Sequence, residues 1–225
     1  NISRQVQDLF AFNSQNKTAK AQAQGLFSEE IIAVEIPQRK ADPIVFDTDE
    51  HPRQTPLDKL ASLGTPFKKE GGTVTAANAS GVNDGACALI IASDKAVKEH
   101  NLTPIAKIVG TVAIGVEPRI MGIGPAPATQ KLLKKYKLTI DDIDVIELNE
   151  AFAAQYLACE RKLGIDRDIT NVNGSGISLG HPVGCTGLRI VVTLVYEMIR
   201  RDVNVGLATL CVGGGMGMAT IVARE

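Results

Sequence analysis

Three short stretches combine residue types that can carry chemistry. They are "LNEAFAAQ" at 148–155, "GISLGHPVGCTG" at 176–187 and "LCVGGGMG" at 210–217. An imidazole such as that of His181 can activate a thiol such as that of Cys211, and a thiolate is the reactive species. The same pair could also act as a general base and an oxyanion donor. The residue types therefore favour Cys–His chemistry, with Asn149 as a third polar group.

Two of these stretches also have a plain structural interpretation. Asn149, directly before "EAFAAQYLA", would be a good helix N-cap, or its side chain could hold a water or polarise a carbonyl. The glycines at 213–215 would close a hairpin beside a structural Cys211, or present backbone N–H groups to an anion. A dinucleotide loop is disfavoured, because "MATIVARE" after the glycines is typical of a strand and that loop requires a helix.

A metal site is not predicted. The sequence contains three histidines, and His51 and His100 share no ligand spacing with His181. The three stretches offer no cluster of carboxylates either, which a metal site would use. His181, held between Gly180 and Pro182, is therefore interpreted as a turn histidine that could point between two layers.

Composition excludes several classes of partner. The chain has 225 residues, is 44% hydrophobic, and carries 24 basic against 25 acidic residues, so no global field attracts nucleic acid or a membrane. No apolar run approaches the ~18 residues of a membrane span. Four cysteines without a C-x-x-C pair indicate reduced thiols, and we expect a cytoplasmic location or an organelle matrix. They are Cys87, Cys159, Cys185 and Cys211.

The first 72 residues have few regular elements. The apolar spacing predicts a helix from Arg4 to about Gln24, with Ser3 as its N-cap. A strand is predicted in "EIIAVEIP" at 30–37. Residues 37–72 are rich in Pro, Asp, Lys and Gly, and predict a long excursion that carries a short helix near 57–63.

From residue 73 strands and helices alternate, which favours an α/β layered domain with a largely parallel sheet. The last two strands, joined by the glycine turn, must pair antiparallel. The helix at 188–201 is apolar on nearly every side and is expected to be buried between two layers. The three chemical stretches each follow a predicted strand, where open α/β sheets place ligands. The predicted strands are 86–93 (of the buried type), 105–115, 144–148, 206–212 and 217–224, and the predicted helices are 94–100, 127–136, 149–163 and 188–201.

In this order, the three stretches resemble the C-terminal signatures of the thiolases, the acetyl-CoA C-acyltransferase family. N-E-A-F stands at 149–152, G-H-P-x-G at 180–184 and C-x-G-G-G-x-G at 211–217, and "DEHPR" at 49–53 and "GTVTAANASGVNDGA" at 72–86 extend the likeness. The resemblance implies the thiolase fold. Residues 81–225 would form a layered αβα C-terminal domain with a five-stranded mixed sheet, and residues 1–80 part of the loop domain that covers CoA.

The resemblance also implies an activity: condensing an acyl-CoA with acetyl-CoA, or cleaving a 3-oxoacyl-CoA with CoA. His181 would activate a nucleophilic cysteine and donate to the thioester oxygen. Cys211 would move the proton at the α-carbon, and Asn149 would hold a water that, with His181, binds the enolate oxygen. The N–H of Gly213 would serve a second oxyanion hole.

Substrate contacts follow from the same resemblance. Ser80 would meet the pantetheine, Arg53 the nucleotide end, and Met121 the acyl group. CoA would be a substrate or product, with no resident cofactor, and the complete enzyme a homodimer or tetramer. The tunnel walls would be Phe67, Ala76, Ala151 and Phe152, and the candidate phosphate neighbours are Lys59, Lys68 and Lys69.

One departure from the family pattern is expected to matter. None of the four cysteines stands in the nucleophile motif, and Cys87 and Cys185 are interpreted as packing residues. The chain is therefore expected to be a fragment that lacks the N-terminal nucleophile half and does not turn over alone. Two alternatives stay open: a noncatalytic CoA-binding or assembly fragment, and a Cys–His hydrolase built on Cys211 and His181.

Overall fold

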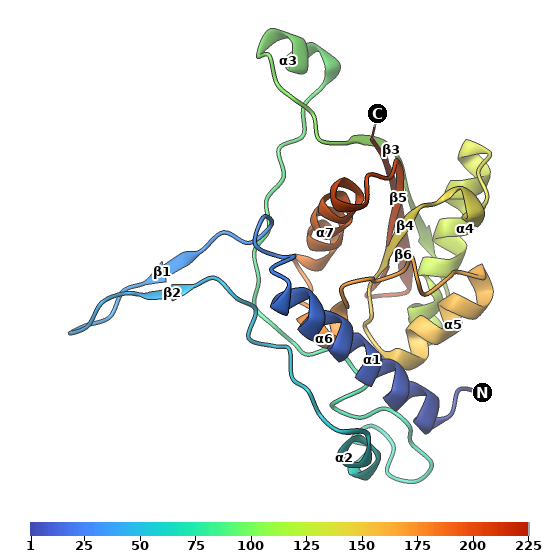
Figure 1. Ribbon diagram of the computed structural model, residues 1–225. Helices are drawn as coiled ribbons and strands as arrows, with labels where there is room; N and C mark the ends of the chain where they lie inside the picture. The colour runs from blue at the N-terminus through green and yellow to red at the C-terminus, as the bar shows by residue number, and fades with distance from the viewer. Residues whose placement is uncertain (225) are drawn as a thin grey trace.

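A computed structural model describes residues 1–224 and is built around one mixed sheet (Figure 1). Its strands are β3 (Lys107–Gly115), β4 (Val145–Leu148), β5 (Val205–Val212) and β6 (Met216–Ala223), in the order β3-β6-β5-β4. Only β4 and β5 are parallel, because β6 turns back from β5 and also pairs antiparallel with β3. The α/β class is thus confirmed. The expected five strands and largely parallel sheet are wrong for the described residues, where the sheet has four strands.

Helices cover both faces of this sheet, as Figure 1 shows. One face carries α4 (Pro125–Tyr136) and α5 (Ala153–Leu163), and the other carries α7 (Thr186–Arg201). Side chains alternate along β4, so Ile146 and Leu148 enter the α4/α5 core, whereas Val145 packs with α7. Two short 3₁₀ helices, η1 (Pro118–Ile123) and η2 (Ile140–Asp142), complete this part of the chain.

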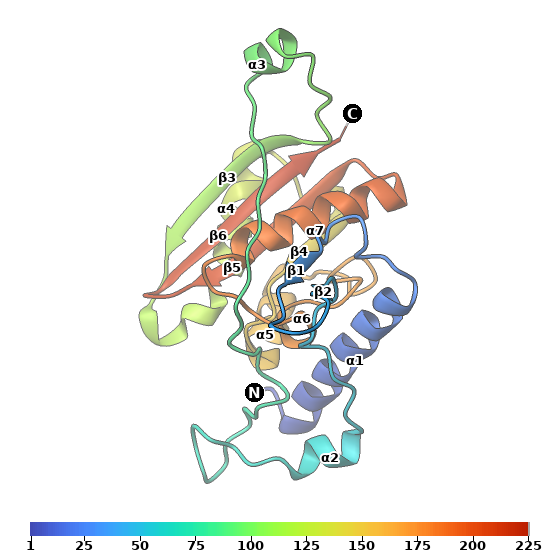
Figure 2. The ribbon, with the colours of Figure 1, turned by 90° about the vertical axis from the view of Figure 1, so that its left-hand side faces the viewer.

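The helix α7 is buried on one side only. Ile190, Leu194 and Met198 are almost fully buried against the sheet, whereas Val191 is half-buried and Ile199 is exposed. The expected burial between two layers is therefore wrong for residues 1–224. The sheet supplies the inner layer, and on the outer side the extended chain that leads to α3 runs past the helix (Figure 2).

The N-terminal region is tied to the layered domain through α1 (Arg4–Ala23). The predicted cap is present, since the Ser3 hydroxyl accepts a 3.4 Å hydrogen bond from the Val6 N–H. Phe10 of this helix stacks on Tyr156 of α5 with ring centroids 4.3 Å apart. Contacts with α2 (Leu57–Ser62) and α6 (Gly176–Leu179) complete its packing. The predicted helices at 4–24 and 57–63 are confirmed.

Two segments stand away from this core (Figures 1 and 2). The strands β1 (Val34–Ile36) and β2 (Ile44–Phe46) form an antiparallel hairpin whose residues are all exposed. The helix α3 (Asp94–Glu99) buries none of its residues. A strand within 30–37 and a helix within 94–100 are as predicted.

The predicted buried strand at 86–93 is wrong. This segment forms no strand, and Ile90 and Ile91 are 93% and 74% exposed. Its sequence has the apolar composition of a buried strand, but no strand among residues 1–224 lies beside it to pair with its backbone. No helix among the described residues is long and apolar enough to cross a membrane.

Candidate functional site

Residues 149–152 form a loop, and Asn149 does not cap a helix. The helix α5 begins at Ala153, with Phe152 in an extended conformation (φ −148°, ψ 143°) at its N-cap. An isolated bridge pairs Phe152 with Ala79, and the Ala153 N–H donates to the Asn78 carbonyl at 2.9 Å. Asn149 itself is fully buried, and its N–H donates to the Thr209 carbonyl at 3.0 Å. Both the capping interpretation and a helix from residue 149 are thus wrong.

The structure brings Asn149 and His181 together and defines the protonation of the imidazole. The Asn149 Nδ2 lies 3.4 Å from His181 Nε2, and His181 Nδ1 lies 2.6 Å from Thr186 Oγ1. The Thr186 hydroxyl donates its single hydrogen to the Pro182 carbonyl at 2.9 Å. With the hydroxyl hydrogen directed to Pro182, His181 Nδ1 is the donor to Thr186, and the lone pair of Nε2 faces the Asn149 amide.

The surroundings keep His181 neutral. Burial lowers the pKa of its imidazole, and the positive charge of Arg189 lowers it further. At neutral pH the ring is consequently uncharged, with Nε2 free to accept a proton. This is the state that a general base requires.

Asn149 offers an unused acceptor at the same place. Its Oδ1 is buried and has no hydrogen-bond partner within residues 1–224. A buried acceptor without a partner costs about 1–3 kcal/mol, so a donor from a water or a substrate would be stabilised there.

Cys211 lies at the same edge of the sheet as Asn149. It stands near the end of β5, two residues beyond Thr209, and is 6% exposed. Burial raises the pKa of its thiol, so the thiol is protonated at neutral pH. Among residues 1–224 no hydrogen bond joins Cys211 to His181 or to Asn149, so the protein as described contains no activated Cys–His pair.

The turn 213–215 is a hairpin turn, with Gly214 at φ +82° and Gly215 at φ +97°. The Gly215 carbonyl accepts from the Val116 N–H at 2.8 Å, and a Cβ at Gly215 would lie 2.6 Å from the Val116 carbonyl oxygen. Glycine is therefore required at 215 for both conformation and space. Gly213 is exposed and open to solvent on its Cβ side. Its oxyanion role stays a prediction.

The stretch 78–83 joins the loops that carry Asn149 and His181. The Ser80 N–H donates to the Ala151 carbonyl at 3.0 Å, and Val82 forms an isolated bridge with His181. The His181 N–H donates to Asn83 Oδ1 at 3.2 Å. Sequence reasoning missed both Asn83 and Thr186. Their only signal was position: Asn83 three residues after Ser80, and Thr186 five residues after His181 at the start of a helix.

The residues predicted to contact CoA lie in different parts of the fold. Ser80 lies against Ala151 and next to the bridge at Phe152, beside the loop of Asn149. The Arg53 guanidinium donates to the Ala76 carbonyl at 2.9 Å. Phe67 is 78% exposed in the segment after α2, and Met121 is half-buried in η1. The three candidate phosphate neighbours are exposed: Lys59, Lys68 and Lys69.

The two cysteines interpreted as packing residues are neighbours. Cys87 and Cys185 are both half-buried, and burial raises the pKa of each thiol. Cys185 directly precedes α7. A raised pKa leaves both thiols protonated at neutral pH, which is consistent with packing.

A buried contact between a carboxyl group and a guanidinium lies beside the site. Glu147 Oε2 is 3.7 Å from Arg189 Nη1, and neither Glu147 oxygen has a hydrogen-bond partner in residues 1–224. Burial raises the pKa of Glu147 to about 8, although Arg189 opposes the shift. Glu147 and Asn149 point to the same face of the chain, and the positive charge of the same Arg189 lowers the pKa of His181.

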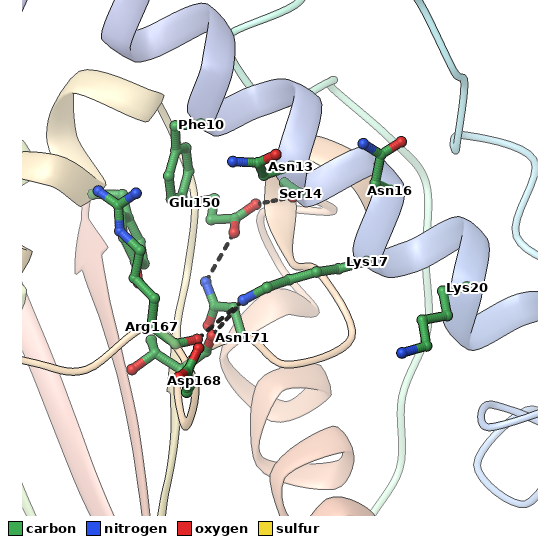
Figure 3. A pocket seen from close by; sticks show the side chains of 12 residues that line it. Phe10, Asn13, Ser14, Asn16, Lys17, Lys20, Glu150, Arg167, Asp168 and Asn171 are labelled. Atoms are coloured by element: carbon green, nitrogen blue, oxygen red, sulfur yellow. Dashed lines mark hydrogen bonds between the residues drawn. The ribbon is translucent and has the colours of Figure 1, made fainter.

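A cavity of about 410 Å³ lies elsewhere, between α1 and residues 167–171 (Figure 3). Its lining includes none of Asn149, His181 and Cys211. Lys17 closes one side by donating to the carbonyls of Arg167 and Thr170, at 3.2 and 3.0 Å. No group of three or more potential metal-ligating side chains gathers in the described part of the chain.

The fold and site define an αβ-layered protein in which the loops of Asn149 and His181 meet at the end of a parallel strand pair, where Cys211 stands near the end of β5. The family model described as "Thiolase, C-terminal domain" matches residues 102–224, and the one described as "Thiolase, N-terminal domain" matches residues 1–95. The chain belongs to the thiolase family. The resemblance seen in its motifs is thereby confirmed.

Comparison with individual relatives supports the same family. The chain is 53% identical to a "Beta-ketoadipyl-CoA thiolase" of Acinetobacter baylyi, over 99% of this chain and 56% of that protein. It superimposes on the acetyl-CoA acetyltransferase of Bacillus anthracis with a TM-score of 0.96 and 49% identity, covering 100% of this chain and 57% of that one. It also resembles human mitochondrial 3-ketoacyl-CoA thiolase in complex with CoA, with a TM-score of 0.94, 49% identity, and coverage of 100% and 55%.

The chain thus spans a little over half the length of the relatives it matches. The family models divide it by sequence between residues 95 and 102. The predicted loop domain at 1–80 and C-terminal domain at 81–225 stay predictions.

Proposed function

We propose that the complete polypeptide, meaning this chain with whatever its gene encodes beyond it, catalyses thiolase acyl transfer. It would condense an acyl-CoA with acetyl-CoA, or cleave a 3-oxoacyl-CoA with CoA. The observation that carries the proposal is the contact of the Asn149 amide with a neutral His181 whose Nε2 lone pair is fixed by Thr186. Membership of the thiolase family supports the reaction class.

In this proposal His181 works through Nε2. It takes the proton of the nucleophilic thiol and then, carrying that proton, donates to the thioester or enolate oxygen. Asn149 supplies the buried Oδ1 acceptor for a water that donates to the same oxygen. Preorganised donors of this kind stabilise the developing oxyanion, and one donor is typically worth about 10²- to 10³-fold in rate. The Gly213 N–H would serve the second oxyanion.

Cys211 is proposed as the group that moves the α-carbon proton. A raised pKa keeps its thiol protonated, so it suits the step in which the carbanion produced by cleavage is protonated. In condensation it would first have to lose its proton to the solvent or to another group at the site.

The nucleophilic cysteine is proposed to come from sequence that this chain does not include. Burial raises the thiol pKa of each of the four cysteines here, and within residues 1–224 none of these thiols is hydrogen-bonded to His181, the base that would take the proton of the nucleophile. The chain covers 56% of its Acinetobacter relative, which leaves room for such a segment. The exposed apolar residues at 86–93 and on the outer side of α7 are surfaces it would cover.

CoA is proposed as substrate and product, without a resident cofactor. A similar human thiolase has been solved in complex with CoA. Ser80, Ala151 and Phe152 lie beside the Asn149 loop, which fits contact with the pantetheine end, and Arg53 and Ala76 would meet CoA further out. We propose a homo-oligomer for the complete enzyme, and a reducing compartment because all four cysteines are free.

The test is turnover of 3-oxoacyl-CoA esters of several chain lengths by the complete polypeptide, with and without CoA. Cleavage that requires CoA supports the proposal, and the kcat/KM series defines the acyl class. Ester hydrolysis without CoA, together with electrophile labelling of Cys211, would replace the proposal with a Cys–His hydrolase. CoA binding without turnover would leave a noncatalytic CoA-binding protein.

A further inference from the structure

A second histidine is connected to the catalytic loop by hydrogen bonds. The His181 N–H donates to Asn83 Oδ1 at 3.2 Å, and Asn83 Nδ2 lies 3.2 Å from His51 Nδ1. His51 Nε2 lies 3.2 Å from the carbonyl of Ile177, in the short helix just before His181. Asn83 thus links the backbone of His181 to His51 of the "DEHPR" stretch.

The protonation of His51 follows from its partners. A carbonyl oxygen only accepts, so His51 Nε2 carries the proton and donates to Ile177. His51 Nδ1 is then the acceptor for the Asn83 amide N–H. Burial lowers the pKa of His51, as does Arg53, while Asp49 opposes them; Arg53 and Asp49 are the charged groups that act on it. His51 is therefore neutral, and its tautomer is opposite to that of His181.

Two glycines make room for this connection. A Cβ at Gly180 would lie 2.5 Å from Asn83 Oδ1, and Gly180 has φ +93°. A Cβ at Gly81 would collide with the His51 ring. Any side chain at either position would push Asn83 or His51 out of place, so the backbone is built closely around both.

At its other end, this hydrogen-bonded connection reaches the Asn149 loop through Ile177. The Ile177 N–H donates to Glu150 Oε2 at 3.3 Å, and Glu150 also accepts from Ser14 at 2.6 Å and from Asn171 at 3.0 Å (Figure 3). Glu150 is almost fully buried and directly follows Asn149. The bonds therefore form a closed circuit, from Asn149 through Glu150, Ile177, His51 and Asn83 to His181.

We infer that Asn83 and His51 are positioning residues that hold His181 Nε2 against the Asn149 amide. The catalytic consequence rests on the proposed function, whereas the geometry does not. Neither residue touches the reacting atoms in this proposal. They act by fixing the backbone of His181, and a displacement of about 1 Å in a catalytic group can cost about 10²-fold in rate.

The first test is Asn83→Asp, followed by NMR of the histidine ring nitrogens in this chain. A carboxylate accepts from the His181 N–H but cannot donate to His51 Nδ1, so His51 must gain a proton to remain bonded on both sides. We expect the pKa of His51 to rise by about one to three units. His100→Gln, at an exposed position, is the matched control and leaves the His51 and His181 signals unchanged. A neutral His51 at pH 7 in Asn83→Asp overturns the connection.

The second test compares turnover in the complete polypeptide. Asn83→Ala should lower kcat about 10- to 100-fold with little change in KM, because the substrate contacts remain. His51→Gln, which keeps one donor and one acceptor, should retain more activity than His51→Leu. Equal activity of these two variants, or normal kcat in Asn83→Ala, overturns the positioning role. The NMR result does not depend on turnover, so failure of the proposed function alone would leave it intact.

Discussion

Large apolar side chains are mostly buried or half-buried in the layered domain at 102–224 and mostly exposed in the segment at 24–93. In the first, Leu132, Leu194 and Leu207 are fully buried in two cores around the sheet. In the second, Ile32 and Ile90 are 87% and 93% exposed, and the hairpin β1–β2 buries nothing. Within that segment Phe27 and Leu60 are buried, and residues 75–83 contact the loops of Asn149 and His181. The difference indicates that the layered domain forms its own core, whereas much of the segment has no core of its own within residues 1–224.

The largest expected effect is the loss of turnover when a proposed catalytic residue is replaced. His181→Ala and Cys211→Ala should each lower acetoacetyl-CoA cleavage by the complete polypeptide about 10³-fold or more, because each removes a proton-transfer group. The measurement is loss of acetoacetyl-CoA absorbance at saturating CoA. His100→Ala, at an exposed histidine between the two regions, should leave the rate unchanged. Near-normal turnover in either catalytic variant would reject its assigned role.

This difference in burial predicts that truncating an apolar side chain destabilises the protein more in the layered domain than in the exposed segment. Leu194→Ala should reduce the free energy of unfolding by about 2–5 kcal/mol, since it leaves a cavity between α7 and the sheet. Ile90→Ala should change it by less than about 0.5 kcal/mol in this chain, because the side chain is already exposed. Urea denaturation of both variants provides the comparison. Equal losses would show that residues 86–93 pack in solution.

Thr186 tests whether the orientation of His181 depends on the layered domain as well as on Asn83. Thr186→Val keeps the shape but removes the acceptor for His181 Nδ1–H, at a cost of about 1–3 kcal/mol, or about 10- to 100-fold in kcat. Ring-nitrogen NMR should show loss of the single tautomer. Thr186→Ser, which restores the hydroxyl, is the control. A rate in Thr186→Val equal to that of Thr186→Ser would contradict this role.

The smallest expected effect is a change in the rate of hydrogen exchange at the exposed residues 86–93. Backbone amides at 86–93 have no strand partner within residues 1–224, so we expect fast hydrogen exchange there and slow exchange in β5. In the complete polypeptide, exchange at 86–93 should slow at least about tenfold, because the proposed additional segment would pair with it. Unchanged exchange in the longer protein would mean that the segment is a free linker.

Local pattern was sufficient to predict the first helix and much of the layered domain. The helices at 4–24 and 127–136 and the last two strands were predicted within a few residues, because period, caps and breakers act on neighbouring residues. The exposure of residues 86–93 and of the outer side of α7 could not be predicted from the sequence. Their composition requires burial, but whether a partner surface lies within the chain is a property of the whole fold.

The sequence by itself determined the family and pointed to Asn149, His181 and Cys211 as candidate site residues, because their motifs are short and contiguous. Tertiary structure alone decided that Asn149 faces His181 rather than capping α5, and that Thr186 and Asn83 fix the imidazole. Those contacts join residues 5 to 98 positions apart. Hydrogen bonds between such distant groups depend on how the loops pack, which no local spacing encodes.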